Sequence, residues 1–440
     1  MWRTVATTAL AALGMALAAP SLEAATYNVC VRVIVQTSDT GLSVNGVTEN
    51  HYLGTNAAAG LEVIARGFRV MLLQQEADGS IWAEVFDSNT SDGCFSFSRG
   101  GSNVYSVVVQ GYATDGEDNH IRIHTGGTDT STWFPGETID RAFVNQPLGG
   151  DNYFVLDGAE DDRWTTIAVA AFGLYRWDNE TTDTIISIGF SEDEDDGCGD
   201  SSSMYGDSTS YIESLRAHLI KIGHCDTTDQ TESRKKMLVT HELGHAMARL
   251  YYGHDGAESP LYAYYVPFDF DETDPNYDEC VNTLGYNLTS LEANSLAFKE
   301  GFADFYSARV WNNASAHGSY QRFGTPVDLE AWDAAGGVNT PGGYTLNVCG
   351  STAIGVSTRS DYLRFFWDWH TTSACASAPT QRDLLELYRR VRENDRIGAY
   401  PLTNWNYDDA LLNAVATNVG DLSGCQIGRA FIYLGHNNGG

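Results

Sequence analysis

Residues 240–246 read Thr-His-Glu-Leu-Gly-His-Ala, and this short stretch constrains the fold more than any other part of the chain. Its His-Glu-x-x-His pattern lies within a helical pattern, which puts His241 and His245 one turn apart on the same face. Both imidazoles can therefore reach one metal ion, and the carboxylate of Glu242 can reach a water molecule on that ion. Two histidines also occur together by chance, so a metal site here requires a third ligand from elsewhere in the fold.

The helix that carries this pattern is expected to run from about Thr231 to Tyr252. Asp229 and Glu232 are three residues apart, as in a capping box at the start of a helix. Gly253 follows the last helical position, where glycine commonly ends a helix. The small Gly244 between the two histidines allows another element to pack closely beside the metal site.

The third ligand does not follow directly after the second histidine. In metzincins the pattern continues as x-x-Gly-x-x-His, but Ala248 and Tyr251 occupy those two positions here. His254 lies three residues too far along and is interpreted as a residue at the helix end. A metzincin arrangement is therefore excluded.

Residues 291–307 form a second strong helical pattern, in which Glu300 and Asp304 share one face. From that face Glu300 can ligate a metal ion while Asp304 accepts the second N–H of a ligand histidine. The alternative is an acidic stripe on the protein surface. The neighbouring Gly301 and Ala303, together with flanking aromatic residues, are too apolar for a solvated face and favour the ligand interpretation.

His-Glu-x-x-His combined with Glu300-Gly-Phe-Ala-Asp304 resembles the gluzincin class of zinc metallopeptidases. Glu300 follows His245 by 55 residues, which is close to the spacing in neprilysin-like enzymes, and the text fits their Glu-x-x-Ala-Asp pattern. The Glu-Gly-Phe-Ala text is also similar to the aminopeptidase branch. The resemblance covers residues 231–252 and 291–310. It implies Zn2+ on His241, His245 and Glu300, with Glu242 as general base and Asp304 as the residue that orients a histidine.

The resemblance further implies hydrolysis of a protein or peptide substrate by a zinc-activated water. Three protein ligands leave one open position on zinc, as in catalytic sites. A further donor then stabilises the tetrahedral oxyanion. Gluzincins similar to this chain place a histidine for that role in the C-terminal helical part, where His370 lies, and Tyr306 and His317 compete for it.

Two other functions remain open from the sequence. The first is a non-catalytic exported binding or adhesion protein with a structural zinc, which the presence of Glu242 disfavours. The second is a zinc hydrolase of a non-peptide substrate, because a zinc-bound water is not selective by itself.

The sequence predicts a multidomain protein, in which an all-β sandwich is followed by a zincin-like α+β domain. Residues 25–150 form the predicted accessory sandwich, loosely similar to transthyretin-like and CnaB-type modules, and residues 126–150 are interpreted as connecting structure. Its expected strands are Val29–Val35, Gly67–Leu73, Ile81–Val85, Cys94–Phe97, Val104–Val109 and Ile121–Ile123.

Residues 151–440 form the predicted zincin-like metallopeptidase domain, with a mainly helical C-terminal part. A helix over Trp164–Tyr175 is expected to pack against a sheet, and Thr184–Phe190 is an expected strand. The helices expected in the C-terminal part span residues 360–369, 381–393 and 407–418.

Residues 1–24 are typical of a signal peptide, which predicts a secreted or periplasmic protein. Arg3 precedes an apolar run that ends near Pro20, and no later stretch is long and apolar enough to cross a bilayer. The eight cysteines include no Cys-x-x-Cys, so disulfides are their expected use. Sequential pairing is the simplest arrangement: Cys30–Cys94, Cys198–Cys225, Cys280–Cys349 and Cys375–Cys425.

An excess of acidic residues limits the partners that this chain can have. The 58 acidic and 26 basic residues give a formal net charge of −32, which argues against nucleic acid or an anionic membrane surface as partner. Acidic residues cluster at 191–197 and 269–279, and each cluster is either a solvated loop or a Ca2+ site.

Overall fold

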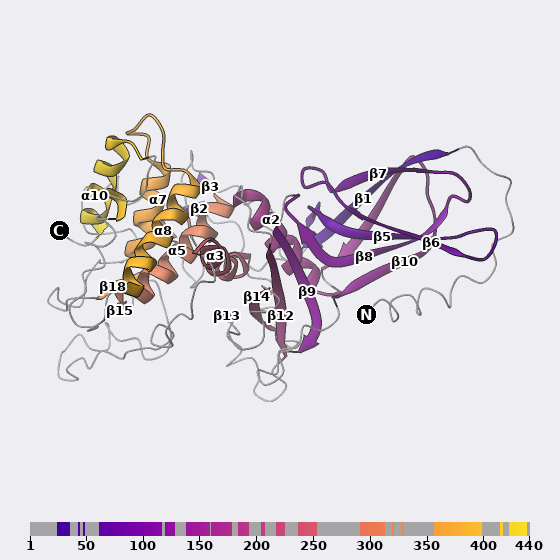
Figure 1. Ribbon diagram of the computed structural model, residues 1–440, viewed down its shortest axis with the longest axis horizontal. Coiled ribbons are helices and arrows are strands. Elements are labelled where there is room, and N and C mark those ends of the chain that lie inside the picture. The colour runs from indigo at the N-terminus through magenta and orange to yellow at the C-terminus, as the bar shows by residue number, and fades with distance from the viewer. Residues whose placement is uncertain are drawn as a thin grey trace. The chain divides into compact units, whose positions relative to one another are not determined.

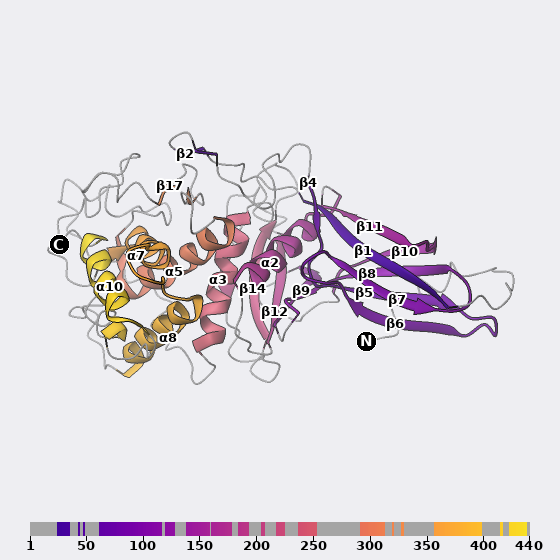
Figure 2. The same ribbon diagram turned by 90° about the horizontal axis from the view of Figure 1, so that it is seen from above.

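The computed structural model describes residues 24–35, 43–44, 47–48, 61–116, 119–127, 138–158, 160–177, 184–192, 204–206, 217–224, 236–252, 291–312, 319–320, 327–329, 356–397, 414–416 and 422–437. The chain divides into two compact units, residues 1–40 with 55–239 and residues 41–54 with 240–440. Strands dominate the N-terminal part and helices the C-terminal part, as predicted (Figure 1, Figure 2).

The smaller sheet of the first unit is built around β1 (Ala25–Val35). This strand pairs in parallel with β11 (Asp151–Asp157) and antiparallel with β4 (Leu61–Ile64) and β7 (Cys94–Arg99). Its β-branched residues favour an extended backbone, and Val29, Val31 and Val33 are fully buried. The strands predicted at Val29–Val35 and Cys94–Phe97 are therefore confirmed.

The larger sheet of the first unit combines antiparallel and parallel pairing. Its antiparallel part consists of β5 (Phe68–Gln75), β6 (Ile81–Asp87), β8 (Val104–Thr114) and β10 (Asp140–Pro147). Its parallel part consists of β9 (Asn119–Gly127), β12 (Thr184–Glu192) and β14 (Ala217–His224), with β13 (Met204–Gly206) antiparallel beside β14. The other strands predicted from the sequence coincide with β5, β6, β8, β9 and β12.

The interpretation of residues 126–150 as connecting structure is wrong, because β10 pairs with β8 there. Most side chains of β10 are exposed, so the strand lacks the apolar alternation that identifies a half-buried strand. Its register shifts between Phe143 and Gln146, and Asn145 between them has a φ of 53°. The larger sheet contains strands from both sides of residue 150, where the domain boundary stays a prediction.

Aromatic side chains join the two sheets of the first unit. Tyr27 and Phe97 of the smaller sheet contact Tyr105 of the larger one, with ring centroids 5.7 and 5.4 Å apart. Helix α2 (Arg163–Trp177) contacts β1, β8 and β9. The helix predicted at Trp164–Tyr175 is therefore confirmed, as is its packing against a sheet.

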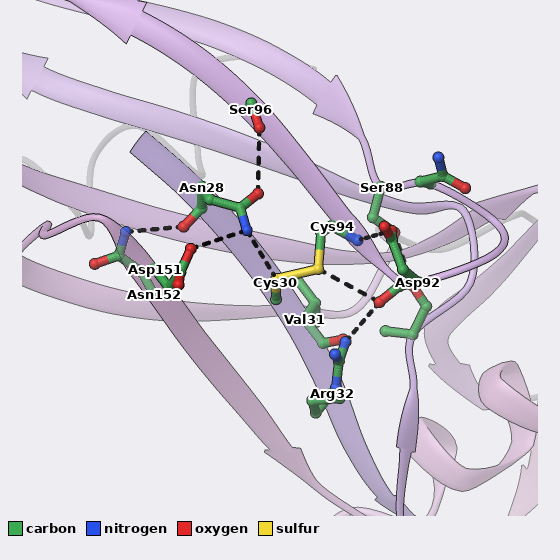
Figure 3. The surroundings of a disulfide bond; sticks show 12 residues. Asn28, Cys30, Val31, Arg32, Ser88, Asp92, Cys94, Ser96, Asp151 and Asn152 are labelled. Carbon is green, nitrogen blue, oxygen red and sulfur yellow. Dashed lines mark hydrogen bonds between the residues drawn. A yellow bond between two sulfur atoms is a disulfide. The ribbon is translucent and has the colours of Figure 1, made fainter. Parts of the chain in front are cut away.

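Cys30 on β1 and Cys94 on β7 face each other across the smaller sheet and form a disulfide (Figure 3). The side chain of Asn28 lies beside this bridge, where its Nδ2 donates to Oδ1 of Asp151 at 3.2 Å. On the other side, the backbone N–H of Cys94 donates to Oδ1 of Asp92 at 2.9 Å. Hydrogen bonds around the disulfide thus involve β1, β11 and the residues directly before β7.

A second disulfide joins Cys375 to Cys425 in the C-terminal part. Both bridges match the sequential pairing predicted, whereas the other two predicted pairs lie outside the described residues. The disulfides indicate an oxidising, extracytoplasmic compartment, and the predicted signal peptide also lies outside the described residues. Among the described helices, none has the length and apolar character needed to span a membrane.

The second unit is mainly helical within its described residues. Its longer elements are α3 (Lys236–Tyr252), which starts in the first unit, α5 (Asn294–Trp311), α7 (Arg359–Thr371), α8 (Gln381–Ile397) and α10 (Gly424–Asn437). Three phenylalanines of α5, Phe298, Phe302 and Phe305, pack against Phe366 of α7, with ring centroids 5.6, 5.2 and 5.5 Å away. This aromatic contact holds α5 and α7 side by side.

Three short strand pairs belong to the described part of this unit as well. β15 (Leu291–Ala293) pairs with β18 (Val356–Thr358), β16 (Ser319–Tyr320) pairs with β17 (Val327–Asp328), and β2 (Ser43–Val44) pairs with β3 (Val47–Thr48). The helix predicted from Leu291 therefore begins three residues later than expected, because its first residues pair with β18 instead.

Helix α10 was not predicted, although Ser423 and Gln426 carry a capping-box signature. The Ser423 backbone N–H donates to Oε1 of Gln426 at 2.7 Å, and the Gln426 backbone N–H donates to Oγ of Ser423 at 3.3 Å. Of the helix predicted at 407–418, residues 414–416 are helical and the others lie outside the described residues. The acidic clusters at 191–197 and 269–279, predicted to be solvated loops or Ca2+ sites, also lie outside the described residues, apart from residues 191–192 at the end of β12.

Candidate metal centre

Helix α3 brings the two histidines of the His-Glu-x-x-His pattern together. Their spacing of one helical turn aligns the two imidazoles, and Nε2 of His241 lies 3.1 Å from Nε2 of His245. Both side chains are buried. The predicted helix is confirmed over Lys236–Tyr252, and its expected first residues lie outside the described part of the chain.

Helix α5 supplies the third donor that the sequence predicted. Oε2 of Glu300 lies 3.3 Å from Nε2 of His241, and Oε1 lies 3.4 Å from Nε2 of His245. One donor atom from each of the three residues lies within 4.8 Å of the other two, so this group could hold a metal ion. Among the described residues, it is the one group of this kind.

A glycine allows α5 to approach α3 this closely. A Cβ atom added to Gly244 would lie 2.9 Å from Cβ of Tyr306 and 3.1 Å from Cα of Ala303, which is too close for a side chain. Next to this contact, Oγ1 of Thr240 lies 2.8 Å from Oγ of Ser307 and accepts a bond from the Trp311 indole at 2.9 Å. The two helices are thus joined by buried hydrogen bonds directly beside the histidines.

The surroundings shift the pKa values of two of the three donor groups. Burial lowers the pKa of His245, which favours its neutral imidazole over the protonated form. Burial alone would raise the pKa of Glu300, but the neighbouring His245 and Arg359 and hydrogen bonds from both histidines hold that pKa well below its usual value. A neutral imidazole and an ionised carboxylate are the forms of these two groups that bind a metal cation.

Asp304 occupies the position expected for a residue that orients a ligand histidine. Its Oδ1 lies 2.6 Å from Nδ1 of His241, and its side chain is fully buried. When the imidazole of His241 carries its proton on Nδ1, the lone pair of Nε2 points toward the candidate metal ligands His245 and Glu300. Tyr320 donates its hydroxyl to the same Oδ1 at 2.6 Å, which fixes the carboxylate in turn.

Arg359, the first residue of α7, belongs to the site but was not predicted. Its Nη2 lies 2.9 Å from Oε2 of Glu300, and its Nε lies 3.2 Å from Oδ2 of Asp304. The side chain is 1% exposed. No local spacing in the sequence signals this residue, since it follows Glu300 by 59 positions.

Glu242 lies between the two histidines in the sequence of α3, and its side chain is buried, with 2% of the residue surface exposed. Tyr306, one of the residues considered for oxyanion stabilisation, is fully buried where α5 meets Gly244. His317, the other one, lies outside the described residues. The catalytic roles of these side chains stay predictions.

His370 is not brought to the metal-ligand group. Its Nε2 accepts a hydrogen bond from Nε of Arg309 at 2.7 Å, and its Nδ1 lies 3.1 Å from the carbonyl oxygen of Pro379. Arg359 and His370 are 11 residues apart on α7, which is about 16 Å along a helix. Both ring nitrogens are engaged there, and the oxyanion role predicted for His370 gains no support from these contacts.

These contacts of His370 predict a dependence of stability on pH. Burial, with the nearby positive charge of Arg309, lowers the pKa of His370 to about 4. An unfolded histidine titrates near pH 6.5, so between about pH 6.5 and 4 the unfolded chain binds a proton that the folded chain does not. As the pH decreases from about 6.5 to 4, the free energy of unfolding should therefore decrease, by up to about 3 kcal/mol from this residue.

Urea unfolding of wild type and His370→Gln at several pH values measures this contribution. The glutamine carbonyl can still accept from Arg309 but does not titrate, so the variant should lose less stability than wild type between pH 6.5 and 4. Equal losses of stability in the two proteins would show that His370 does not resist protonation.

Comparisons with family models, with curated proteins and with solved structures found no match.

Proposed function

We propose that the chain is an exported zinc-dependent metallopeptidase of the gluzincin type, with His241, His245 and Glu300 as metal ligands. The observation that carries the proposal is the closeness of the three donor groups: the two Nε2 atoms lie 3.1 Å apart, and those of His241 and His245 lie 3.3 Å from Oε2 and 3.4 Å from Oε1 of Glu300. Ligands at the usual distances of zinc in a tetrahedral site are about 3.3 Å from one another. Each pair of donor groups therefore has one contact near this spacing, and the buried Glu242 lies on the same helix as the two histidines.

The proposal extends to the architecture of the chain. Residues 25–150 would form a β-sandwich accessory domain, since the two sheets of that region contact each other through aromatic side chains. Residues 151–440 would form the zincin-like catalytic domain with a helical C-terminal part.

Each residue of the site has a defined part in this mechanism. A bound zinc ion would polarise the scissile carbonyl group and acidify the attacking water. Glu242 accepts the proton that this water loses and passes it to the amine that leaves. Asp304 keeps a proton on Nδ1 of His241, so that the lone pair of Nε2 stays available to bind the metal ion. Tyr320 holds Asp304 in this orientation.

Metal analysis and peptide cleavage test the proposal. The protein should contain one zinc ion per chain, and its hydrolysis of casein or a peptide mixture should stop after treatment with a chelator. Adding one equivalent of zinc should restore cleavage and raise the melting temperature, because an ion that binds the folded chain alone stabilises it.

Other outcomes distinguish the competing functions. Zinc binding without hydrolysis of any peptide would favour a binding or adhesion protein with a structural zinc. Zinc-dependent cleavage of esters but not of amides would favour a hydrolase of a non-peptide substrate. Cleavage that persists without any metal would contradict the proposed chemistry.

A further inference from the structure

Arg359 places its guanidinium against both carboxylates of the metal centre. Its Nη2 lies 2.9 Å from Oε2 of Glu300 and donates to Oδ1 of Asp304 at 3.3 Å, and its Nε lies 3.2 Å from Oδ2 of Asp304. A buried guanidinium is costly unless carboxylates or other acceptors meet its N–H groups. The positive charge also offsets one of the two negative charges of this group, in which Asp304 is fully buried and Glu300 is 16% exposed.

The backbone around Arg359 is fixed relative to Glu300. A Cβ atom added to Gly301 would lie 2.7 Å from the carbonyl oxygen of Arg359. The backbones of α5 and α7 are therefore in close contact at Gly301, the residue directly after Glu300. Thr358, directly before Arg359, pairs with Leu291, three residues before α5 begins. Arg359 therefore keeps its position relative to α5 without help from a metal ion.

The two oxygens of Glu300 have different surroundings. Each lies within 3.4 Å of a histidine nitrogen of the site, so a carboxylate without other partners could bind an ion through both oxygens. Oε2, however, is also held by Arg359. An oxygen that accepts from a guanidinium has less electron density to give to a cation, which disfavours ligation through Oε2.

We propose that Arg359 is a positioning residue that restricts Glu300 to metal ligation through Oε1 alone. One oxygen from Glu300 and one nitrogen from each histidine leave a fourth position for the water that a catalytic site needs. A carboxylate bound through both oxygens would fill that position. The inference rests on the proposed metal site but does not depend on peptide hydrolysis.

Cobalt substitution makes this coordination visible. Four-coordinate Co2+ absorbs visible light severalfold more strongly than Co2+ with five or six ligands. The wild-type chain loaded with one Co2+ should show the strong absorption. Arg359→Met, which removes the guanidinium, and Arg359→Lys, which keeps the charge but not the planar fork, should both absorb severalfold less per cobalt. Their zinc affinity, measured by competition with a chelating dye, should fall by about 10–100-fold.

Arg309→Met is the matched control. Arg309 lies on α5 as Glu300 does, and its Nε donates to Nε2 of His370 at 2.7 Å. This variant should keep the absorption and the zinc affinity of wild type. If Arg359→Met does not fold, as judged by circular dichroism, Arg359→Lys decides the test. A folded Arg359 variant with the wild-type absorption and zinc affinity overturns the inference.

Peptide cleavage by wild type separates this inference from the proposed function. If wild type binds Co2+ with strong absorption, the Arg359 variants lose that absorption and no peptide is cleaved, the role of Arg359 is supported and the peptidase proposal is overturned. A wild-type chain that binds neither Zn2+ nor Co2+ overturns both.

Discussion

Replacing Glu242 with glutamine is expected to lower kcat for peptide hydrolysis by roughly 10²–10⁴-fold. Glutamine has the size of glutamate but cannot accept the proton of the attacking water. Because Glu242 is buried on the helix of the two histidines without being one of the proposed ligands, the variant should still bind one zinc ion per chain. Cleavage assays and metal analysis on the same samples measure the two effects.

Glu386→Gln is a suitable control for this prediction. Glu386 lies on α8 and pairs with Arg389 and Arg390 at 2.6 and 2.8 Å, in a part of the helix surface that has no role in the proposed mechanism. Its substitution should leave kcat unchanged. Equal cleavage by Glu242→Gln and wild type would rule out Glu242 as the general base.

Adding a single methyl group at Gly301 is expected to have the second large effect. A Cβ atom there would lie 2.6 Å from Cβ of Tyr362 and 2.7 Å from the carbonyl oxygen of Arg359, so α7 would have to move away from α5. Gly301→Ala should therefore lower the free energy of unfolding by about 1–3 kcal/mol. The same shift would withdraw Arg359 from Glu300, so zinc affinity should fall as well.

Gly428→Ala provides the opposite expectation for the same substitution. Gly428 lies within α10, and a Cβ atom added there would meet nothing within 4 Å. Alanine should stabilise this helix by roughly 0.5–1 kcal/mol relative to glycine. Thermal or urea unfolding of the two variants compares them directly. A Gly301→Ala protein as stable as Gly428→Ala would mean that α5 and α7 tolerate greater separation.

The metal-ligand residues could be predicted because the chemistry limits their spacing. His241 and His245 must be one helical turn apart to reach one ion, and Glu300 with Asp304 repeats that spacing on a second helix. The structure brings these four side chains together. Their catalytic roles remain to be tested by the experiments above.

Arg359 could not be predicted in the same way, because its distance from Glu300 in the sequence follows from tertiary packing. It reaches the site through the pairing of β15 with β18 and the close contact at Gly301. Neither feature has a local sequence pattern. β10 was missed for a related reason, since pairing with β8 defines it and not the burial of an apolar face.

The pairing of β15 with β18 also affects how the chain between them can evolve. It joins the segment before α5 to the segment before α7, so the positions of Glu300 and Arg359 do not depend on the length of chain between residues 330 and 355. Any connecting segment that lets β15 and β18 pair is therefore compatible with this placement of Glu300 and Arg359. Its length is free to change in evolution without a change at the candidate metal centre.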